Sequence, residues 1–174
     1  MTIQPLGVLK RDPDIPEWLR SAPIAVPYFG GVKLPFVLNG FEDDATPADF
    51  ESALNAFFRL GAAEREQASH YVFRLYRRFV EAVGEDEFDF TIPSASAVWE
   101  FVTPTEVHVS RRHRRDKLIY VELLSECRWE VEHGLAVIYR SGSILSRVSE
   151  QDGHLTTADA FDFPEEKDAI IYSD

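Results

Sequence analysis

Cysteine is nearly missing from this chain, since Cys127 is its single thiol and no disulfide can form within one chain. Long apolar runs are missing as well, because Arg77, Glu122 and Arg140 interrupt the stretches that come nearest to the roughly 20 apolar residues of a membrane helix. The N-terminal residues contain neither the basic nor the apolar segment of a secretion signal. We therefore expect a cytoplasmic protein with no membrane partner.

Positive charge is scarce. The chain has 18 Lys and Arg residues against 30 Asp and Glu residues, which gives a net charge of −12 and a pI of about 4.8. Such a protein repels phosphate backbones and attracts basic surfaces, so a basic protein is the expected partner and nucleic acid is not. The one basic run, residues 111–115, lacks the aromatic residues that stack on bases. It predicts a solvated loop between strands, with a docking patch as the alternative.

Motifs that define a reaction are absent from the sequence. The chain contains no glycine-rich nucleotide-binding loop, no Gly-x-Ser-x-Gly, no His-Glu-x-x-His and no Cys-x-x-Cys. It also contains no internal repeat or heptad pattern. The sequence therefore indicates no cofactor and no particular class of enzyme.

The composition predicts one folded domain over residues 1–174. A chain of 174 residues with 45% hydrophobic and 13% aromatic residues can bury a sizeable core. Residues 1–30 are rich in proline, and we expect them to lie over that core as an arm with little regular structure. Residues 32–38 follow as an edge-strand candidate, because Pro35 cannot donate a hydrogen bond to a neighbouring strand.

Apolar residues at helical spacing predict two helices within residues 46–84, and Gly61 predicts a short turn that makes them an antiparallel helix pair. After residue 89 the hydrophobic period falls toward two, which predicts a sheet over residues 97–149. The expected strands lie near residues 97–102, 105–111, 117–129, 135–140 and 143–149. Residues 150–174 follow as an acidic tail segment, in which eight acids and one base give a net charge of −7.

The predicted fold class is therefore α+β, with the N-terminal antiparallel helix pair packed on a C-terminal, mainly antiparallel sheet. Residues 117–125 are largely apolar on both faces, which predicts a central strand covered by the helix pair on one side and by the arm on the other. Alternation divides the residues of this strand between the two faces, with Ile119, Val121, Leu123 and Cys127 on one and Leu118, Tyr120 and Leu124 on the other.

The densest group of functional side chains lies in residues 127–134, between two apolar runs. In chain order it contains Cys127, Trp129, Glu130, Glu132, His133 and Gly134. The pattern Cys-x-Trp-Glu-x-Glu-His-Gly resembles the signature of a family of bacterial proteins known only as a domain of unknown function. The resemblance covers roughly residues 28–161 and implies one compact domain without assigning a catalytic residue. Some small acidic families of this kind are immunity or accessory proteins beside secreted toxins.

A metal site and a nucleophile are two chemical hypotheses for this stretch. Sulfur, oxygen and nitrogen donors that zinc accepts come from Cys127, Glu130, Glu132, His133 and, after a later turn, His154. Their spacing does not follow the ligand pairs of structural zinc sites, so a metal ion is not expected. A nucleophilic Cys127 is disfavoured too, because the residue is in phase with apolar side chains and neighbouring carboxylates raise the pKa of a thiol.

Acid–base chemistry and a purely structural role are the other two hypotheses. Glu130 and Glu132 share one face if the chain is extended there, and they could form an acid–base pair. In the structural interpretation Trp129 anchors the strand end in the core, the acids solvate a bend, and Gly134 supplies a positive φ. The structural interpretation is the favoured one.

The leading functional hypothesis is a non-enzymatic protein-interaction module, such as an immunity or accessory protein, whose acidic surface attracts a basic partner. Its expected binding residues are Trp129, Glu130, Glu132, His133 and His154, together with the acidic tail segment. The alternative is a small metal-dependent or acid–base enzyme, which requires these side chains to converge in one pocket. A third hypothesis places a small-ligand pocket between the helix pair and the sheet. The sequence is compatible with a monomer or a dimer.

Overall fold

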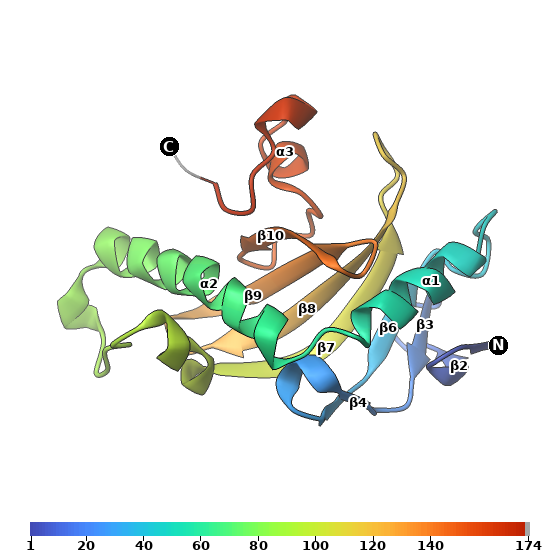
Figure 1. The fold of residues 1–174 in the computed structure, drawn as a ribbon, viewed down its shortest axis with the longest axis horizontal. Coiled ribbons are helices and arrows are strands. Elements are labelled where there is room, and N and C mark those ends of the chain that lie inside the picture. The colour runs from blue at the N-terminus through green and yellow to red at the C-terminus, as the bar shows by residue number, and fades with distance from the viewer. Residues whose placement is uncertain (173–174) are drawn as a thin grey trace.

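One large mixed sheet forms the centre of the molecule (Figure 1). The computed structural model describes residues 1–172, and it contains an eight-stranded sheet in the order β1-β2-β3-β6-β7-β8-β9-β10. Its strands are β1 (Thr2–Ile3), β2 (Gly7–Arg11), β3 (Trp18–Ser21), β6 (Phe36–Asn39), β7 (Val102–Arg111), β8 (Ile119–Cys127), β9 (Glu130–Arg140) and β10 (Ile144–Ser149). The β6–β7 pair is parallel and the other pairs are antiparallel. Strands β4 (Ile24–Val26) and β5 (Val32–Leu34) form a separate antiparallel pair.

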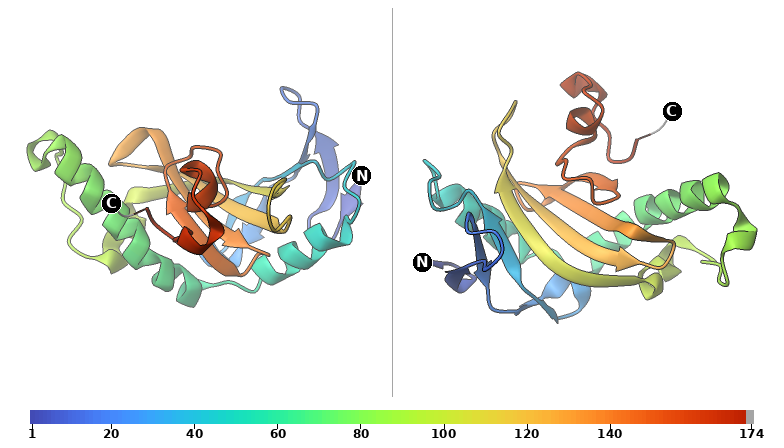
Figure 2. Two further views of the ribbon diagram at one scale, coloured as in Figure 1. Left: turned by 90° about the horizontal axis from the view of Figure 1, so that it is seen from above. Right: turned by 180° about the vertical axis from the view of Figure 1, so that it is seen from behind.

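Two α-helices cover one face of this sheet, and they do not form the predicted pair. Helix α1 (Ala48–Phe57) packs against β8 and α2 (Ala62–Val83) packs against β10, so the two helices follow each other end to end across the sheet (Figures 1 and 2). Gly61 does not reverse the chain, because its φ is −139° and its N–H is capped by the Glu64 carboxylate at 2.8 Å. Within residues 1–172, no helix combines the length and the apolar character that crossing a membrane requires.

The predicted fold class is therefore wrong in its arrangement. The sheet is not C-terminal, because β1, β2, β3 and β6 precede both helices in the chain, and β6 joins them to the later strands by pairing with β7. Helical periodicity reports only that one face of a helix is buried, and a sheet can bury that face as well as a second helix can. The bounds of both helices were predictable from the sequence, whereas the surface that covers them was not.

The N-terminal segment contributes strands where the sequence predicts an arm. Proline keeps these strands short, and Pro35 separates β5 from β6 without moving β6 to an edge. Strand β6 lies between β3 and β7, and the Pro35 carbonyl accepts a hydrogen bond from the Val107 N–H at 3.0 Å. The edge-strand prediction for residues 32–38 is wrong for β6, because an interior position requires acceptors as well as donors and proline keeps its carbonyl. It holds for β5, which is an edge strand of the two-stranded sheet.

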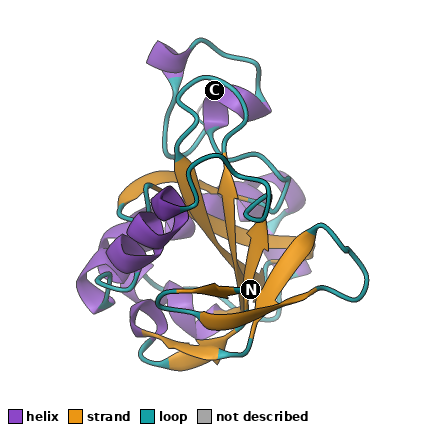
Figure 3. Cartoon of the chain, turned by 90° about the vertical axis from the view of Figure 1, so that its right-hand side faces the viewer, coloured by secondary structure: helices purple, strands orange, loops and turns teal. Residues whose placement is uncertain are grey.

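The remaining elements are short. They are the 3₁₀ helices η1 (Pro27–Phe29), η2 (Glu85–Glu87), η3 (Ala95–Phe101) and η4 (Glu165–Lys167), and the helix α3 (Thr157–Ala160). Helix η3 occupies the place of the strand predicted near residues 97–102. Residues 150–172 carry α3 and η4 and stand at the end of the sheet where the β7–β8 loop projects (Figures 1 and 3).

The two faces of the central strand β8 have different surroundings. Ile119, Val121 and Leu123 belong to the main core under the helices. Tyr120 lies on the opposite face, in a small cluster with Ala136 and Ile138 against which Leu124 and Leu155 pack. The alternation of faces predicted for β8 is confirmed for these residues. The cover on the second face includes Leu155 of the C-terminal segment, where the sequence predicts the proline-rich arm.

Gly142 in the β9–β10 turn should be the least replaceable glycine of the fold. Its φ is +74°, and a Cβ there would lie 1.9 Å from the Ala53 carbonyl oxygen of α1. Gly153 has a similar φ of +77° but nothing within 4 Å of a Cβ. We expect Gly153→Ala to lower the free energy of unfolding by about 1–2 kcal/mol, and Gly142→Ala to lower it by clearly more. Urea unfolding of both variants measures the difference, and equal losses would contradict the close approach.

Candidate functional site

The bend that follows Trp129 is held together by one buried carboxylate. Glu130 is 6% exposed and accepts hydrogen bonds from the backbone N–H groups of Glu132 at 3.0 Å and His133 at 2.8 Å. The same carboxylate lies 3.1 Å from Nδ1 of the His133 ring. Gly134 has the predicted positive φ, at +65°. The Glu130 carboxylate is thus engaged in forming the turn, while the Glu132 and His133 side chains are exposed.

The two other prominent side chains of this stretch are buried. Trp129 is 3% exposed and packs edge to face against Tyr76 of α2, with 5.8 Å between ring centroids. Cys127 is buried as well, and its thiol donates a hydrogen bond to the Glu130 carbonyl oxygen at 3.4 Å. Burial raises the pKa of the Cys127 thiol to about 12. Both positions serve the core, as the structural interpretation of the sequence predicts.

His154 does not join the bend. Glu130, Glu132 and His133 line a hollow of about 640 Å³ together with Phe79 of α2 and with phenylalanines of the segment that follows α2. His154 lines a different hollow. Among residues 1–172, no three His, Cys, Asp or Glu side chains are placed to hold a metal ion together. The structure brings Glu130 and His133 into contact, and it separates His154 from them. The convergence that the enzyme hypothesis requires at this bend is therefore not formed.

The larger hollow, of about 710 Å³, lies on the sheet face opposite the helices. Its floor is formed by side chains from five strands, namely Trp18 (β3), Asn39 (β6), His108 and Ser110 (β7), Glu122 and Leu124 (β8) and Ala136 (β9). One wall is the β7–β8 loop with residues 112–115, and the other is the segment containing residues 151–155, Asp159 and Asp162. We call this cavity the concave hollow.

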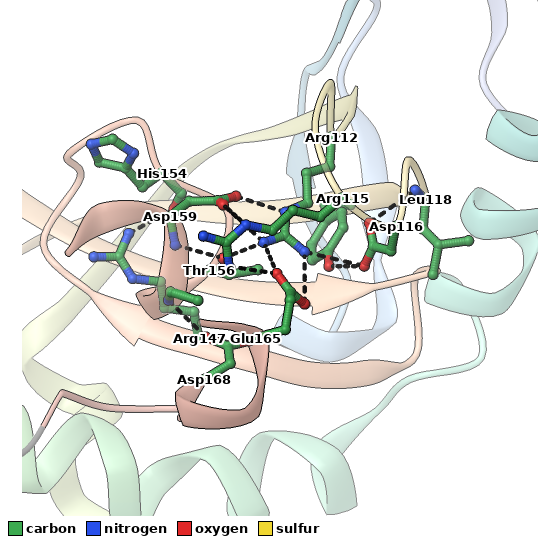
Figure 4. Close-up of polar contacts among 12 residues, drawn as sticks. Arg112, Arg115, Asp116, Leu118, Arg147, His154, Thr156, Asp159, Glu165 and Asp168 are labelled. Carbon is green, nitrogen blue, oxygen red and sulfur yellow. Dashed lines mark hydrogen bonds and ion pairs between the residues drawn. The ribbon is translucent and has the colours of Figure 1, made fainter. Parts of the chain in front are cut away.

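A network of ion pairs joins the two walls of the concave hollow (Figure 4). Arg112 is 3% exposed; its Nε donates to Asp159 at 2.6 Å, and its Nη2 donates to Glu165 at 2.6 Å and to Thr156 Oγ1 at 3.0 Å. Arg115 donates to Glu165 at 2.8 Å and lies 3.3 Å from Asp159. The basic run is therefore not simply a solvated loop, because Arg112 and Arg115 bind the acidic segment that follows β10. Arg111 instead pairs with Asp44 and Asp49, which precede α1 or lie in its first turn.

Ion pairs bind three of the acids that the sequence places in the acidic tail, Asp152, Asp159 and Glu165. Hydrogen bonds from Arg112 hold the pKa of the Asp159 and Glu165 carboxyls below their ordinary values. Asp152 is bound in the same way, since Arg147 on β10 donates to its Oδ1 at 2.6 Å and also to the His154 carbonyl oxygen at 2.6 Å. The segment is consequently a folded wall of the hollow and not a free acidic tail.

Glu122 on the floor of the concave hollow has no such partner. It lies opposite His108 in the β7–β8 register, and within residues 1–172 its carboxyl makes no hydrogen bond or ion pair. Burial raises the pKa of Glu122 to about 7. His108 itself is engaged by Glu106 at 2.6 Å, and this contact lowers the pKa of Glu106 to about 2. Two acids on one sheet face thus differ widely in proton affinity, and a carboxyl with a raised pKa in a cleft marks a functional-site candidate.

The sequence contains a signal for Glu122 that its periodicity does not explain. Glu122 is a carboxylate on a strand whose flanking residues are apolar on both faces, and a buried acid is rare unless it is paired. In the sequence analysis, Glu122 is used only as a charged residue that interrupts an apolar run and so argues against a membrane helix. The sequence favours the bend as a site because several functional groups lie close together in the chain there. Closeness along the chain does not show whether those groups line a cavity.

The fold and this site define a sheet-dominated domain with one face under helices and the other hollowed into a polar cavity. The chain matches the family described as Domain of unknown function (DUF6985) over residues 5–155, and it belongs to that family. The match includes every strand of the large sheet apart from β1, and it includes the segment with Asp152 and His154. No curated protein and no solved structure matches the chain.

Arg112 should be the residue on which the walls depend most. We expect Arg112→Ala to lower the free energy of unfolding by about 3–5 kcal/mol, because it leaves Asp159 and Thr156 without their buried partner. Arg114→Ala, in the same loop, is the matched control, since Arg114 is exposed and makes no ion pair within residues 1–172. It should change stability by less than about 0.5 kcal/mol. Urea unfolding measures both values, and similar losses would contradict the network's role.

Cys127 should be unreactive in the folded protein. With a pKa of about 12 and 4% exposure, almost none of its thiol is both ionised and accessible at pH 8. We expect a colorimetric disulfide reagent to leave the native protein unmodified over hours and to modify one thiol per chain at once in urea. Rapid modification without denaturant would show instead that Cys127 is available for chemistry.

Proposed function

We propose that this protein is a non-enzymatic protein-interaction module and that the concave hollow is its recognition site. The observation that supports this choice is the combination of a hollow of about 710 Å³ with a floor carboxyl, Glu122, that has no partner within residues 1–172. Its neighbours Arg112 and Arg147 are already matched by ion pairs. A floor carboxyl without a partner can accept a complementary group.

The concave hollow supports recognition better than the bend does. At the bend, Trp129 is buried against α2 and the Glu130 carboxylate binds the turn, so of the binding residues predicted there only Glu132 and His133 have exposed side chains. In the hollow, ion pairs fix both walls before any partner arrives. Fixing a site in advance lowers the entropy lost on binding.

A basic partner fits the charge of the molecule. The net charge of −12 attracts positively charged surfaces over distances longer than a hydrogen bond and speeds their encounter. Among the residues that the sequence analysis proposes for binding, His154 lines the hollow itself. An immunity or accessory role in the cytoplasm, in which the protein caps a basic partner, is the form of this function that we favour.

The test is a capture experiment with a variant that fills the hollow. Ser110 lies on the floor at the end of β7 and makes no side-chain hydrogen bond within residues 1–172, so Ser110→Trp should occupy the hollow without disturbing the ion pairs. Glu132→Ala changes the bend and is the comparison. We expect the tagged wild type and Glu132→Ala to retain one stoichiometric basic protein at low salt, and Ser110→Trp to lose it.

Salt and folding serve as controls for this capture. Higher salt should weaken retention, because it screens the long-range attraction between the acidic module and its partner. Circular dichroism and urea unfolding establish that Ser110→Trp is folded. Loss of the partner from Glu132→Ala with retention by Ser110→Trp would place the contact at the bend, and retention by both variants would overturn the assignment to the hollow.

A further inference from the structure

We propose that the concave hollow accepts a single cationic side chain of the partner, a lysine ammonium or an arginine guanidinium, with Glu122 as its counter-ion. This inference rests on the proposed function and specifies what enters the site. Three observations carry it: the pairing of the surrounding charges, the position of Glu122 on the floor, and the uncharged residues beside it.

The basic side chains around Glu122 already contact other acids. His108 on the adjacent strand lies 2.6 Å from Glu106, and Arg147 on β10 lies 2.6 Å from Asp152. Neither forms an ion pair or a hydrogen bond with Glu122 within residues 1–172, although both lie close enough to stabilise its charge. A positive group that enters from outside would therefore be the first direct partner of Glu122.

An anionic guest fits this lining poorly. Arg112 and Arg115 on the wall are held by Asp159 and Glu165, and an anion would have to displace those carboxylates to reach a guanidinium. Arg114 is unpaired within residues 1–172, but it is exposed, and solvent-exposed charges contribute little to binding energy. The deepest unmatched charge in the hollow is thus negative.

The rest of the floor suits the stem of a lysine or arginine. Leu124 and Ala136 line the hollow beside Glu122 and are apolar, so they can pack against the methylene groups of a long side chain. Trp18 lines the same hollow, and the face of an indole ring attracts cations. Strand β9 contributes no charged group to this part of the floor.

Without a guest, a proton neutralises Glu122 below about pH 7. A half-buried carboxylate with no partner is unfavourable, and burial accordingly raises the pKa of Glu122 to about 7. A cationic guest favours the ionised carboxylate, so the guest replaces the proton and lowers the pKa again. Affinity for the guest should then be constant above about pH 8 and fall up to about tenfold per pH unit below pH 7.

The first measurement follows the Glu122 carboxyl directly, by ¹³C NMR of protein labelled in its glutamate carboxyl groups. The Glu122 signal is assigned from its absence in Glu122→Gln. Propylguanidinium chloride is the probe, and butyramide and sodium chloride at matched ionic strength are the controls. At a probe concentration ten times its Kd, we expect the Glu122 pKa to fall by about one unit, because bound cation competes with the proton. A pKa that is the same in probe and in sodium chloride would overturn the proposal.

The second measurement uses the captured partner and separates this inference from the proposed function. Wild type should bind about tenfold more weakly for each pH unit below 7, whereas Glu122→Gln should bind weakly at every pH and lose that dependence. Glu126→Gln is the matched control, since Glu126 is an exposed acid on β8 that does not line the hollow. Histidines also titrate in this range, so the pH dependence of binding supports a role for Glu122 only if Glu122→Gln removes it.

The two proposals fail in different ways. If Ser110→Trp abolishes capture while Glu122→Gln retains full affinity and the wild-type pH dependence, the hollow is the recognition site but no cation pairs with Glu122. If neither substitution affects capture, the hollow is not the site and both proposals are wrong.

Discussion

The buried ion pairs of Arg112 are the interaction on which the concave side of the sheet depends. Arg112 joins the β7–β8 loop to Asp159 and Glu165, which lie 47 and 53 residues further along the chain. A guanidinium that is 3% exposed requires such partners, because an unpaired buried charge is strongly unfavourable. The same contacts that satisfy Arg112 therefore hold the C-terminal segment beside the sheet and create the second wall of the concave hollow.

The two faces of the sheet differ as a result of this arrangement. The helices cover one face completely enough that β8 can place Val121 and Leu123 in a fully buried core. On the other face, the C-terminal segment covers only part of the sheet, and polar side chains such as His108 and Glu122 line what it leaves open. The main core and the proposed recognition site thus lie on opposite sides of the same strands, so a substitution in the lining of the hollow leaves the main core in place.

Much of the secondary structure could be predicted, and most of the topology could not. The residues of α2, β7, β8 and β10 were close to those expected, because hydrophobic periodicity is a local property of the chain. Strand β9 begins at Glu130, five residues before the expected strand. The parallel pairing of β6 with β7 joins segments more than 60 residues apart, and no local pattern specifies it. The site was predicted in part: the buried roles of Trp129 and Cys127 were visible in the sequence, whereas the hollow around Glu122 was not.

The sequence by itself determined the excess of acids, the single thiol, the alternation along β8 and the positive φ at Gly134, since each of these depends on residue type or on near neighbours. Only the tertiary structure decided which acids are neutralised. Asp159 and Asp152 find arginines, and Glu122 finds none within residues 1–172. Charge pairing acts over a few ångströms in space, and the distance between two residues along the chain does not fix that separation.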